Sequence, residues 1–340
     1  MSRNGSARSA STRVQPLKAM RPARAARPAS GRARSLLSVA DLSHEELERC
    51  LTLAARMKQA RAEGRRRDET PLSGRYVALL FDKPSLRTRV TFEIAIRELG
   101  GEPLVVPADS ALGGREPVAD VARNLERWVD AAVIRTFSHQ VIEAFADAAP
   151  RLHVVNALTD EEHPCQALAD LLTLREVLGD LDGRVIAYVG DGNNVATSLA
   201  QACVMAGMQV RVAFPDGYGL PERVRGQISS LARGAGRLEL CASPADAVRG
   251  ASAVYTDVWT SMGQEHEAAE RERAFAGYQV TPELMALAAP GAVFMHCLPA
   301  HRGQEVAADV IDGACSVVLE QAENRLHVQK AVLALLFAAG

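Results

Sequence analysis

The feature that most constrains this chain is a regular alternation of short apolar runs with longer stretches whose apolar residues recur three and four positions apart. This alternation is typical of parallel β-sheets whose strands are joined by crossover helices. The expected strands of the first half are Tyr76–Phe81, Leu104–Pro107, Ala132–Arg135 and Val154–Leu158. Those of the second half are Val185–Val189, Val210–Phe214, Leu238–Cys241, Ala253–Thr256 and Ala292–Cys297. We therefore predict two open parallel-sheet α/β domains with the active site in the cleft between them.

Helical periodicity falls between these strands. The expected helices are Thr88–Leu99, Val118–Val129, Val141–Ala148, Pro164–Leu178 and Asn324–Phe337. We predict that the helix from Pro164 bridges the two halves. The expected domains are residues 35–160 and 161–323, with a C-terminal helix at 324–340 that packs back on the first domain.

The first 34 residues differ in composition from the rest of the chain. They contain nine Arg and Lys residues, no acidic residue and no apolar periodicity. Such a segment buries too little surface to offset the entropy lost on ordering, so we predict that residues 1–34 form a disordered basic tail. A basic, acid-free tail is also typical of an organelle transit peptide. We expect a cytoplasmic protein, with the mitochondrial matrix as the alternative if the tail is a transit peptide.

Composition also narrows the class of partner. Net charge is −2 and aromatic residues make up 4% of the chain, which argues against a nucleic-acid partner. No run reaches the roughly 18 apolar residues of a membrane helix. The six cysteines form no CxxC pair, so neither a disulfide scaffold nor a structural metal site is indicated. We therefore expect a small-molecule partner and no membrane.

Ligands of open parallel sheets bind beyond the carboxyl ends of the strands, so the segments after each strand are the candidate site. After Phe81 comes Lys83-Pro84-Ser85-Leu86-Arg87-Thr88-Arg89, directly before a helix. This places hydroxyl, backbone N–H and guanidinium groups at a helix N-terminus, which is an anion-binding arrangement. The alternative is a helix cap with solvated arginines.

Two further strand ends carry polar residues of the same kind. Arg135 follows the third expected strand, and His163 and Gln166 follow the fourth. Arg135 is suited to a phosphate, while His163 and Gln166 can polarise a carbonyl and hold an amide. Each taken alone is as consistent with a cap or a satisfied core residue.

The loop Gly190-Asp191-Gly192-Asn193-Asn194 looks like part of a dinucleotide fingerprint. A GxGxxG motif requires glycine at position 195, where the chain has Val195. Val195 therefore argues against an NAD-dependent oxidoreductase, which is the alternative from another class and would be revealed by NAD binding. Asn194 is expected either to cap the helix or to hold a polar ligand.

The last two strand ends present Asp257 and Cys297, where catalytic groups of such sheets usually stand. The alternative for Cys297 is an inert buried thiol. Further on, Glu323-Asn324-Arg325 is expected to precede the final helix, where a cation opposes the helix dipole but suits a bound anion.

Together these segments resemble the carbamoyltransferases, and within them the ornithine carbamoyltransferases, from Leu36 to the C-terminus. The carbamoyl phosphate motif of the family, Ser-Thr-Arg-Thr-Arg, stands here as residues 85–89 with leucine in second place. The family segments Arg-Thr-Phe-Ser-His and His-Pro-Cys-Gln stand at 135–139 and 163–166. Asp257 with Ser261-Met262-Gly263 matches the loop that closes on L-ornithine.

The resemblance implies transfer of a carbamoyl group from carbamoyl phosphate to L-ornithine, giving citrulline and phosphate. It implies no cofactor, a homotrimer with shared active sites, and a place in arginine metabolism whose direction the sequence leaves open. The implied carbamoyl phosphate ligands are Ser85, Leu86, Arg87, Thr88, Arg135, His163, Gln166, Cys297, Leu298 and Arg325. The implied ornithine ligands are Asn194, Asp257, Ser261 and Met262. The implied catalytic residues are Arg87, Arg135, His163, Asp257, Cys297 and Arg325.

Two positions depart from the family pattern. Leu86 replaces a threonine and so removes a hydroxyl but leaves the backbone N–H. Ala111 stands where relatives commonly carry Gln or His, a side chain that reaches the phosphate of the neighbouring subunit. These departures leave a catalytically weakened binding paralogue open as an alternative. Another amine acceptor, such as putrescine, is the second alternative.

Overall fold

The computed structural model describes residues 1, 31–83, 85–107, 112, 114–261 and 263–338. Residues 2–30 of the predicted tail lie outside this range. The last four residues of the predicted tail contact the folded part of the chain. The N–H of Ala33 donates to the Pro150 carbonyl at 2.6 Å, and Arg34 pairs with Glu46 at 2.6 Å. Residues 31–34 therefore depart from the prediction, because a carbonyl and a carboxylate hold them in place.

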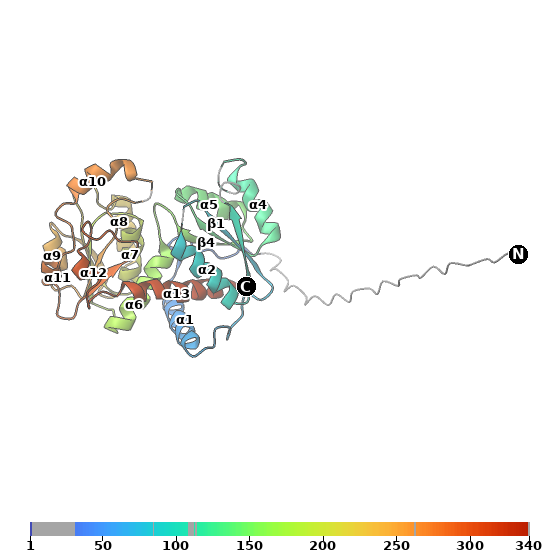
Figure 1. The fold of residues 1–340 in the computed structure, drawn as a ribbon, viewed down its shortest axis with the longest axis horizontal. Helices are drawn as coiled ribbons and strands as arrows, with labels where there is room; N and C mark the ends of the chain where they lie inside the picture. The colour runs from blue at the N-terminus through green and yellow to red at the C-terminus, as the bar shows by residue number, and fades with distance from the viewer. Residues whose placement is uncertain (2–30, 84, 108–111, 113, 262, 339–340) are drawn as a thin grey trace. The chain divides into compact units, whose positions relative to one another are not determined.

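Two sheets made only of parallel strands carry the fold, which confirms the predicted class (Figure 1). The first sheet has the order β2-β1-β3-β4, and the second has the order β7-β6-β5-β8-β9. The strands are β1 (Tyr76–Phe81), β2 (Glu102–Pro107), β3 (Ala131–Arg135), β4 (His153–Leu158), β5 (Val185–Val189), β6 (Gln209–Ala213), β7 (Arg237–Leu240), β8 (Ala253–Thr256) and β9 (Val293–His296). Each predicted strand is present, with ends that differ by at most two residues.

Helices connect the strands and cover both faces of the sheets. The α-helices are α1 (His44–Ala62), α2 (Leu86–Glu98), α4 (Val118–Trp128), α5 (His139–Ala148), α6 (Pro164–Leu178), α7 (Asn194–Met205), α8 (Glu222–Ser230), α9 (Pro244–Val248), α10 (Ala268–Ala274), α11 (Pro282–Met285), α12 (Ala308–Ile311) and α13 (Val318–Ala338). Two 3-10 turns are η1 (Val39–Asp41) and η2 (Glu265–Glu267). No helix among the described residues is both long and apolar enough to cross a bilayer.

The strands alternate between two buried faces, as the pleat requires. In β1, Val77 and Leu79 belong to one apolar cluster, and Ala78 and Leu80 belong to another on the opposite face of the sheet. Helices α4 and α5 supply the second cluster. Where helices cover both faces, as at β1 and β5, the strands are apolar without polar alternation, which is typical of parallel sheets, whereas the edge strands β2 and β7 are largely exposed.

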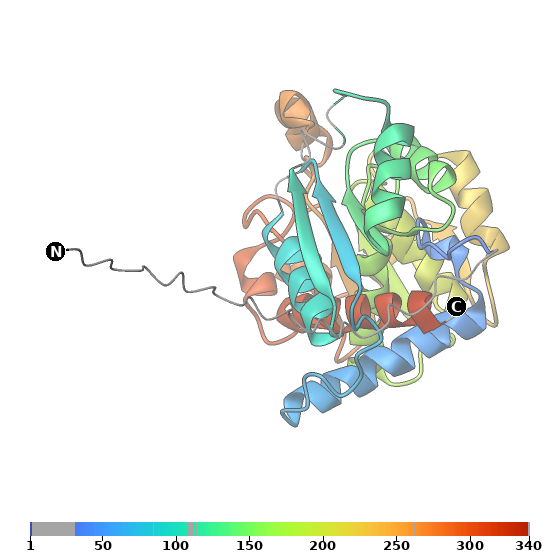
Figure 2. The same ribbon diagram turned by 90° about the vertical axis from the view of Figure 1, so that its right-hand side faces the viewer.

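The final helix is longer than predicted and begins six residues earlier. Val318–Ala338 contains neither Gly nor Pro, so nothing in the sequence interrupts the helix before Asn324. Arg325 therefore lies inside the helix, not ahead of it, and the expectation that it opposes the dipole at an N-terminus is wrong. Helix α13 packs against α1, α2 and α6, and Figure 2 shows it running alongside α1.

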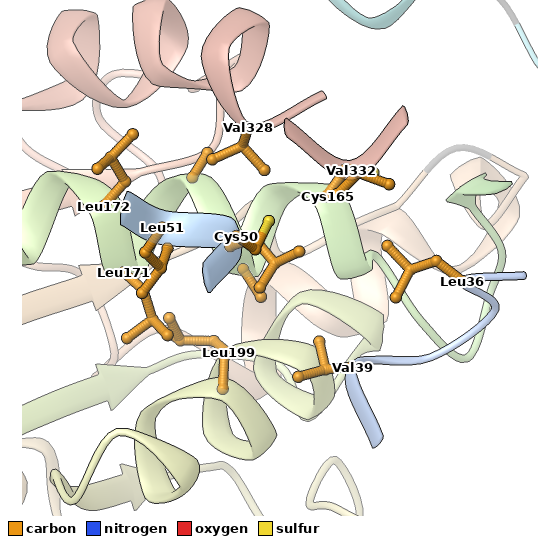
Figure 3. Packing of buried hydrophobic residues seen from close by; sticks show 14 of the residues in the cluster. Leu36, Val39, Cys50, Leu51, Cys165, Leu171, Leu172, Leu199, Val328 and Val332 are labelled. Atoms are coloured by element: carbon orange, nitrogen blue, oxygen red, sulfur yellow. The ribbon is translucent and has the colours of Figure 1, made fainter. Parts of the chain in front are cut away.

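The largest apolar cluster joins the two halves of the chain. Helix α6 is buried on all sides over Pro164–Leu174, since it contacts α13 and α1 as well as α7. Figure 3 shows Leu51, Leu171 and Leu199, from α1, α6 and α7, in one cluster with Val328 of α13. A mostly apolar sequence is expected at such a central place, and the buried stretch also contains the polar residues Gln166, Asp170 and Thr173.

Candidate active site

The loop after β1 leads directly into α2. Ser85 is the N-cap residue, with extended backbone angles, but its side chain makes no capping hydrogen bond. Its hydroxyl therefore remains available to a ligand beside the N–H groups of the first turn. Leu86 is exposed, Arg87 is half-buried and Thr88 is buried. The simple capping role considered for this segment is thus absent.

Thr88 joins this loop to the C-terminal helix. Nη2 of Arg325 donates a hydrogen bond to Oγ1 of Thr88. Arg325 is 3% exposed, and its Nε has no hydrogen-bond partner among the described residues. A buried guanidinium with an unused donor is costly unless an anion or carbonyl takes the bond, so this geometry favours a polar ligand.

Arg135 and His163 lie close to Arg325. Burial and then the nearby Arg325 lower the pKa of Arg135 to about 10, so Arg135 is charged at neutral pH. Burial, followed by Arg325 and Arg135, holds the pKa of His163 well below its usual range. His163 is therefore a neutral imidazole, and its Nδ1 has no partner within the described part of the chain.

The backbone of His163 and the side chain of Gln166 are both fixed by neighbours. The N–H of His163 donates to Oγ of Ser198 at 2.8 Å. Nε2 of Gln166 donates to Oδ1 of Asp170 at 2.8 Å, while its Oε1 has no partner among the residues described. The site thus combines charged donors, a neutral imidazole and a free amide oxygen.

The ends of β8 and β9 bring Asp257 and Cys297 together. Sγ of Cys297 donates to Oδ1 of Asp257 at 3.0 Å, and Nδ2 of Asn193 donates to Oδ2 at 2.8 Å. Burial and the adjacent Asp257 carboxylate hold the pKa of the Cys297 thiol well above its usual range. Cys297 is therefore a hydrogen-bond donor and not a thiolate nucleophile.

Asp257, His296 and Cys297 also form a group with metal-ligand chemistry, since one donor atom from each lies within 4.8 Å of the others. The ring of His296 already has two partners: Nδ1 accepts from the N–H of Leu298 at 2.9 Å, and Nε2 faces Glu305 at 3.3 Å. These protein contacts account for the arrangement of the three side chains without an ion.

Three more of the predicted residues, Leu298, Asn194 and Ser261, make hydrogen bonds within the described part of the chain. Leu298 has a φ of 59°, a left-handed conformation that is unusual for leucine, and the bond from its N–H to His296 holds it there. Nδ2 of Asn194 donates to the Thr159 carbonyl at the end of β4. The N–H of Ser261 donates to Oε1 of Gln264 at 3.2 Å. Met262 and Ala111 lie outside the described residues.

The loop after β8 touches the first sheet. A Cβ placed on Gly263 would lie 3.2 Å from Cε1 of Phe137, which follows β3. Lys83, after β1, stands over the same ring with its Nζ 4.1 Å from the ring centre. The segments that follow β3 and β8, one from each sheet, therefore approach each other.

Two polar residues of the site escaped the sequence analysis. Asn193, not Asn194, caps α7, accepting from the N–H groups of Val195 and Ala196. Asp170 holds Gln166 from four residues further along α6. The signal for Asn193 is its place directly after the glycine pair, and the signal for Asp170 is its helical spacing from Gln166.

Comparison with known proteins gives matches over nearly the whole described chain. The family model for the aspartate/ornithine carbamoyltransferase carbamoyl-P binding domain matches residues 34–176, and the model for the Asp/Orn binding domain matches residues 182–336. The ornithine carbamoyltransferase of Symbiobacterium thermophilum is 54% identical over 307 residues, covering 90% of this chain and 98% of the relative. That of Acidothermus cellulolyticus is 53% identical over 311 residues, covering 90% and 98%. The solved ornithine carbamoyltransferase of Pyrococcus furiosus is 46% identical with a TM-score of 0.86, covering 91% of this chain and 98% of that one.

Proposed function

Because the chain belongs to the aspartate/ornithine carbamoyltransferase family, we propose that it transfers the carbamoyl group of carbamoyl phosphate to the δ-amino group of L-ornithine, releasing citrulline and phosphate. The observation that carries the proposal is the buried group of Thr88, Arg135, His163 and Arg325 beside the Asp257–Cys297 pair. This group offers donors to an anion and a carboxylate to an amine.

The phosphate half of the substrate belongs at the start of α2. Ser85, Arg87, Thr88 and Arg135 supply the hydroxyl and guanidinium donors, and Leu86 contributes its backbone N–H. The helix N-terminus favours the negative charge, and charge-assisted bonds strengthen as charge builds on the departing phosphate. The missing hydroxyl at Leu86 is thereby tolerated, because the backbone donor remains.

The carbamoyl half belongs beside α6 and α13. Neutral His163 and the guanidinium of Arg325 donate toward the carbamoyl oxygen, and Oε1 of Gln166 accepts from the carbamoyl NH₂. Cys297 and Leu298 line the opposite side of the reacting carbon. These donors stabilise the oxyanion of a tetrahedral intermediate.

Ornithine belongs on the second sheet. Asp257 provides the carboxylate for its α-ammonium, and Asn194, Ser261 and Met262 complete the contacts to its amino-acid end. The δ-amine has a pKa near 10.4, so about one molecule in 2,500 is neutral at pH 7, a cost of roughly 4–5 kcal/mol. The site must lower this pKa by removing the amine from water.

The reaction needs only these groups. The neutral δ-amine attacks the carbamoyl carbon, the C–N bond forms, and the C–O bond to phosphate breaks as the intermediate collapses. The amine proton leaves with the phosphate. No atom changes oxidation state.

We further propose a division of labour along the chain. Residues 35–160 with the helix at 324–340 bind carbamoyl phosphate, and residues 161–323 bind ornithine. Helix α13 packs against α1 and α2, which supports its place with the first part, and it also packs against α6, so it joins the two parts. We place the protein in the cytoplasm, with the mitochondrial matrix as the alternative for a cleaved basic tail.

We also propose that the chain works as a homotrimer whose subunits share active sites. Four exposed apolar side chains support an interface at the edge of the first sheet: Leu104 and Val105 on β2, and Leu86 and Val90 on the adjacent α2. An exposed apolar edge strand is a liability unless another chain covers it.

Citrulline formation tests the proposed activity. The purified full chain is incubated with carbamoyl phosphate and, in separate reactions, ornithine, putrescine or lysine. The proposal is supported if citrulline forms in the reaction with ornithine and the other two amines give no carbamoylated product. Carbamoylputrescine as the main product indicates the other acceptor. Carbamoyl phosphate binding without turnover indicates a binding paralogue, and NAD binding indicates the oxidoreductase.

A further inference from the structure

Asp170 is a buried carboxylate at the meeting point of three elements. It lies on α6 with no exposed surface. Its Oδ1 accepts from Nε2 of Gln166 at 2.8 Å and from Nε2 of Gln321 at 2.9 Å. Its Oδ2 accepts from the hydroxyl of Tyr255 at 3.1 Å. Three donors thus hold this buried carboxylate, and such a network of buried hydrogen bonds is rigid.

This network determines how the amide of Gln166 is turned. An ionised carboxylate can only accept hydrogen bonds, so the NH₂ of Gln166 must face Asp170. Its Oε1 then points away from Asp170, and this atom is buried without a partner among the described residues. The reversed amide would set oxygen against oxygen, which costs far more than one hydrogen bond.

The same carboxylate also holds the second sheet. Oε1 of Gln321 accepts from the N–H of His296 at 2.9 Å, directly before Cys297. Tyr255 lies on β8, two residues before Asp257, which follows the strand. Through Gln321 and Tyr255, Asp170 therefore links the Gln166 side chain to the ends of β8 and β9, next to Asp257 and Cys297.

We propose that Asp170 is a positioning residue that makes the site select a carbamoyl group over an acyl group. Held by Asp170, Oε1 of Gln166 accepts a hydrogen bond from the carbamoyl NH₂ but has nothing to accept from the methyl group of an acyl phosphate. This inference rests on the proposed function and names the residue that enforces the substrate class.

Acetyl phosphate is the matched probe, because it replaces the NH₂ of carbamoyl phosphate with a methyl group and keeps the phosphate. The experiment measures the dissociation constants of carbamoyl phosphate, acetyl phosphate and inorganic phosphate for the wild-type chain and for Asp170→Leu. An asparagine would keep an oxygen toward Gln166 and Gln321 and turn its NH₂ to the Tyr255 hydroxyl, whereas leucine has no acceptor, so nothing holds the NH₂ of Gln166 and the Gln166 amide can reverse. We expect the preference for carbamoyl over acetyl phosphate to fall at least tenfold, with inorganic phosphate binding changed less than threefold.

A double-mutant cycle separates this role from general support of the fold. Gln166→Met removes the acceptor directly, so it should lose the same preference, and the double variant should lose no more than either single variant. Glu162→Gln is the matched control. Glu162 is another buried carboxylate that accepts from Ser38, Ser198 and Gln201, yet it does not touch Gln166. Its preference should stay within threefold of wild type.

The wild-type chain gives a second measurement that needs no variant to fold. Burial raises the pKa of Asp170 to about 6, so the carboxylate gains a proton as pH falls through 6. The neutral carboxyl group accepts hydrogen bonds more weakly than the carboxylate, so it holds the Gln166 amide less firmly. The groups facing it are Arg325 on α13, Tyr255 on β8, Cys203 on α7 and Cys297 after β9. Burial raises the pKa of Tyr255 and of both thiols further above neutrality, so none of them titrates near pH 6. We expect the preference to decline below pH 6 in wild type and to be flat with pH in Gln166→Met.

An unchanged preference in folded Asp170→Leu, or equal weakening of all three ligands, would overturn the inference. So would a wild-type preference that does not vary between pH 7 and 5. Failure of the wild-type chain to form citrulline would instead count against the proposed function, since the binding preference is measured without ornithine.

Discussion

Arg87 and Arg89 stand on the same turn of α2 but in different surroundings. Arg87 is half-buried and lies near enough to Arg325 to contribute to the lowering of the Arg325 pKa. Arg89 is exposed and pairs with Glu93 at 3.2 Å. These surroundings favour Arg87 as the arginine of the proposed site, and they place Arg89 on the helix surface.

We predict that Arg87→Ala lowers kcat/KM for carbamoyl phosphate at least tenfold. The change removes a charged donor worth roughly 1.5–3 kcal/mol in binding and more in the transition state. Arg89→Ala is the matched control and should stay within threefold of wild type, because exposed ion pairs contribute little. Steady-state citrulline formation measures both variants, and a loss below threefold for Arg87→Ala would contradict its assignment.

Asp257→Asn tests the ornithine half of the site. The Asp257 carboxylate is held between Asn193 and Cys297, so the substitution removes the negative charge and one acceptor without adding bulk. We predict at least a tenfold rise in the KM for ornithine, a lower kcat and a carbamoyl phosphate dissociation constant within threefold of wild type. Equal weakening of both ligands would show that the two sheets do not divide the substrates as proposed.

Sequence alone located the strand ends, but not the partners that fix each side chain. Arg135, His163 and Asp257 follow apolar runs, so topology places them at one edge. Asn194 was expected either to cap the helix or to hold a polar ligand, and Asn193 caps α7, since the cap is decided by which backbone residue leaves the helix. Asp170 was missed because an acidic residue within a helix usually faces solvent, and only packing shows that it is buried.

At the scale of elements, α13 shows where periodicity fails. The helix is buried along most of its length, so no polar face marks its first turn, and its start at Val318 could not be located from the pattern. Helix α1 was not predicted, although Ser43 and Glu46 form a capping box and its buried positions have helical spacing. The sequence therefore contains the signals that locate this helix.

The buried His327 on α13 should make stability depend on pH. Burial and then Lys330 and Lys58 lower its pKa to about 4, and neither ring nitrogen has a hydrogen-bond partner among the described residues. As pH falls below about 6.5, His327 therefore gains a proton in the unfolded chain but stays neutral in the folded chain until pH approaches 4. This contribution is fully present above about pH 6.5 and is lost progressively toward pH 4.

We predict that His327 accounts for about 2 kcal/mol of the stability lost between pH 7 and 5. His327→Leu should remove that part of the loss, while His266→Leu, at a histidine 76% exposed on its side chain, should leave it unchanged. Urea denaturation of the three proteins at each pH measures the difference. The same pH dependence in His327→Leu as in wild type would rule out this role.

At the scale of the whole molecule, the two sheets end in strands with different consequences. Strand β2 closes the first sheet and exposes Leu104 and Val105, each more than 40% accessible, beside the exposed Leu86 and Val90 of α2. Strand β7 closes the second sheet and exposes Leu240 alone among its large apolar residues. The β2 edge therefore presents apolar side chains next to the first turn of α2, where the neighbouring subunit of the proposed trimer would reach the proposed phosphate site.

We predict that the paired change Leu104→Lys and Val105→Lys converts the assembly to single chains. Lysine on an edge strand blocks pairing and opposes burial of the edge, so the mass in solution should fall from three times 36.4 kDa to one. Leu240→Lys is the control, since it puts a lysine on the edge strand of the other sheet, and it should leave the assembly intact. Light scattering after size exclusion gives the masses. Because the subunits are proposed to share active sites, kcat/KM for carbamoyl phosphate should fall at least tenfold in the single chains. Full activity of the single chains would show that each chain completes its own site. An unchanged mass of the double variant would show that the interface lies elsewhere.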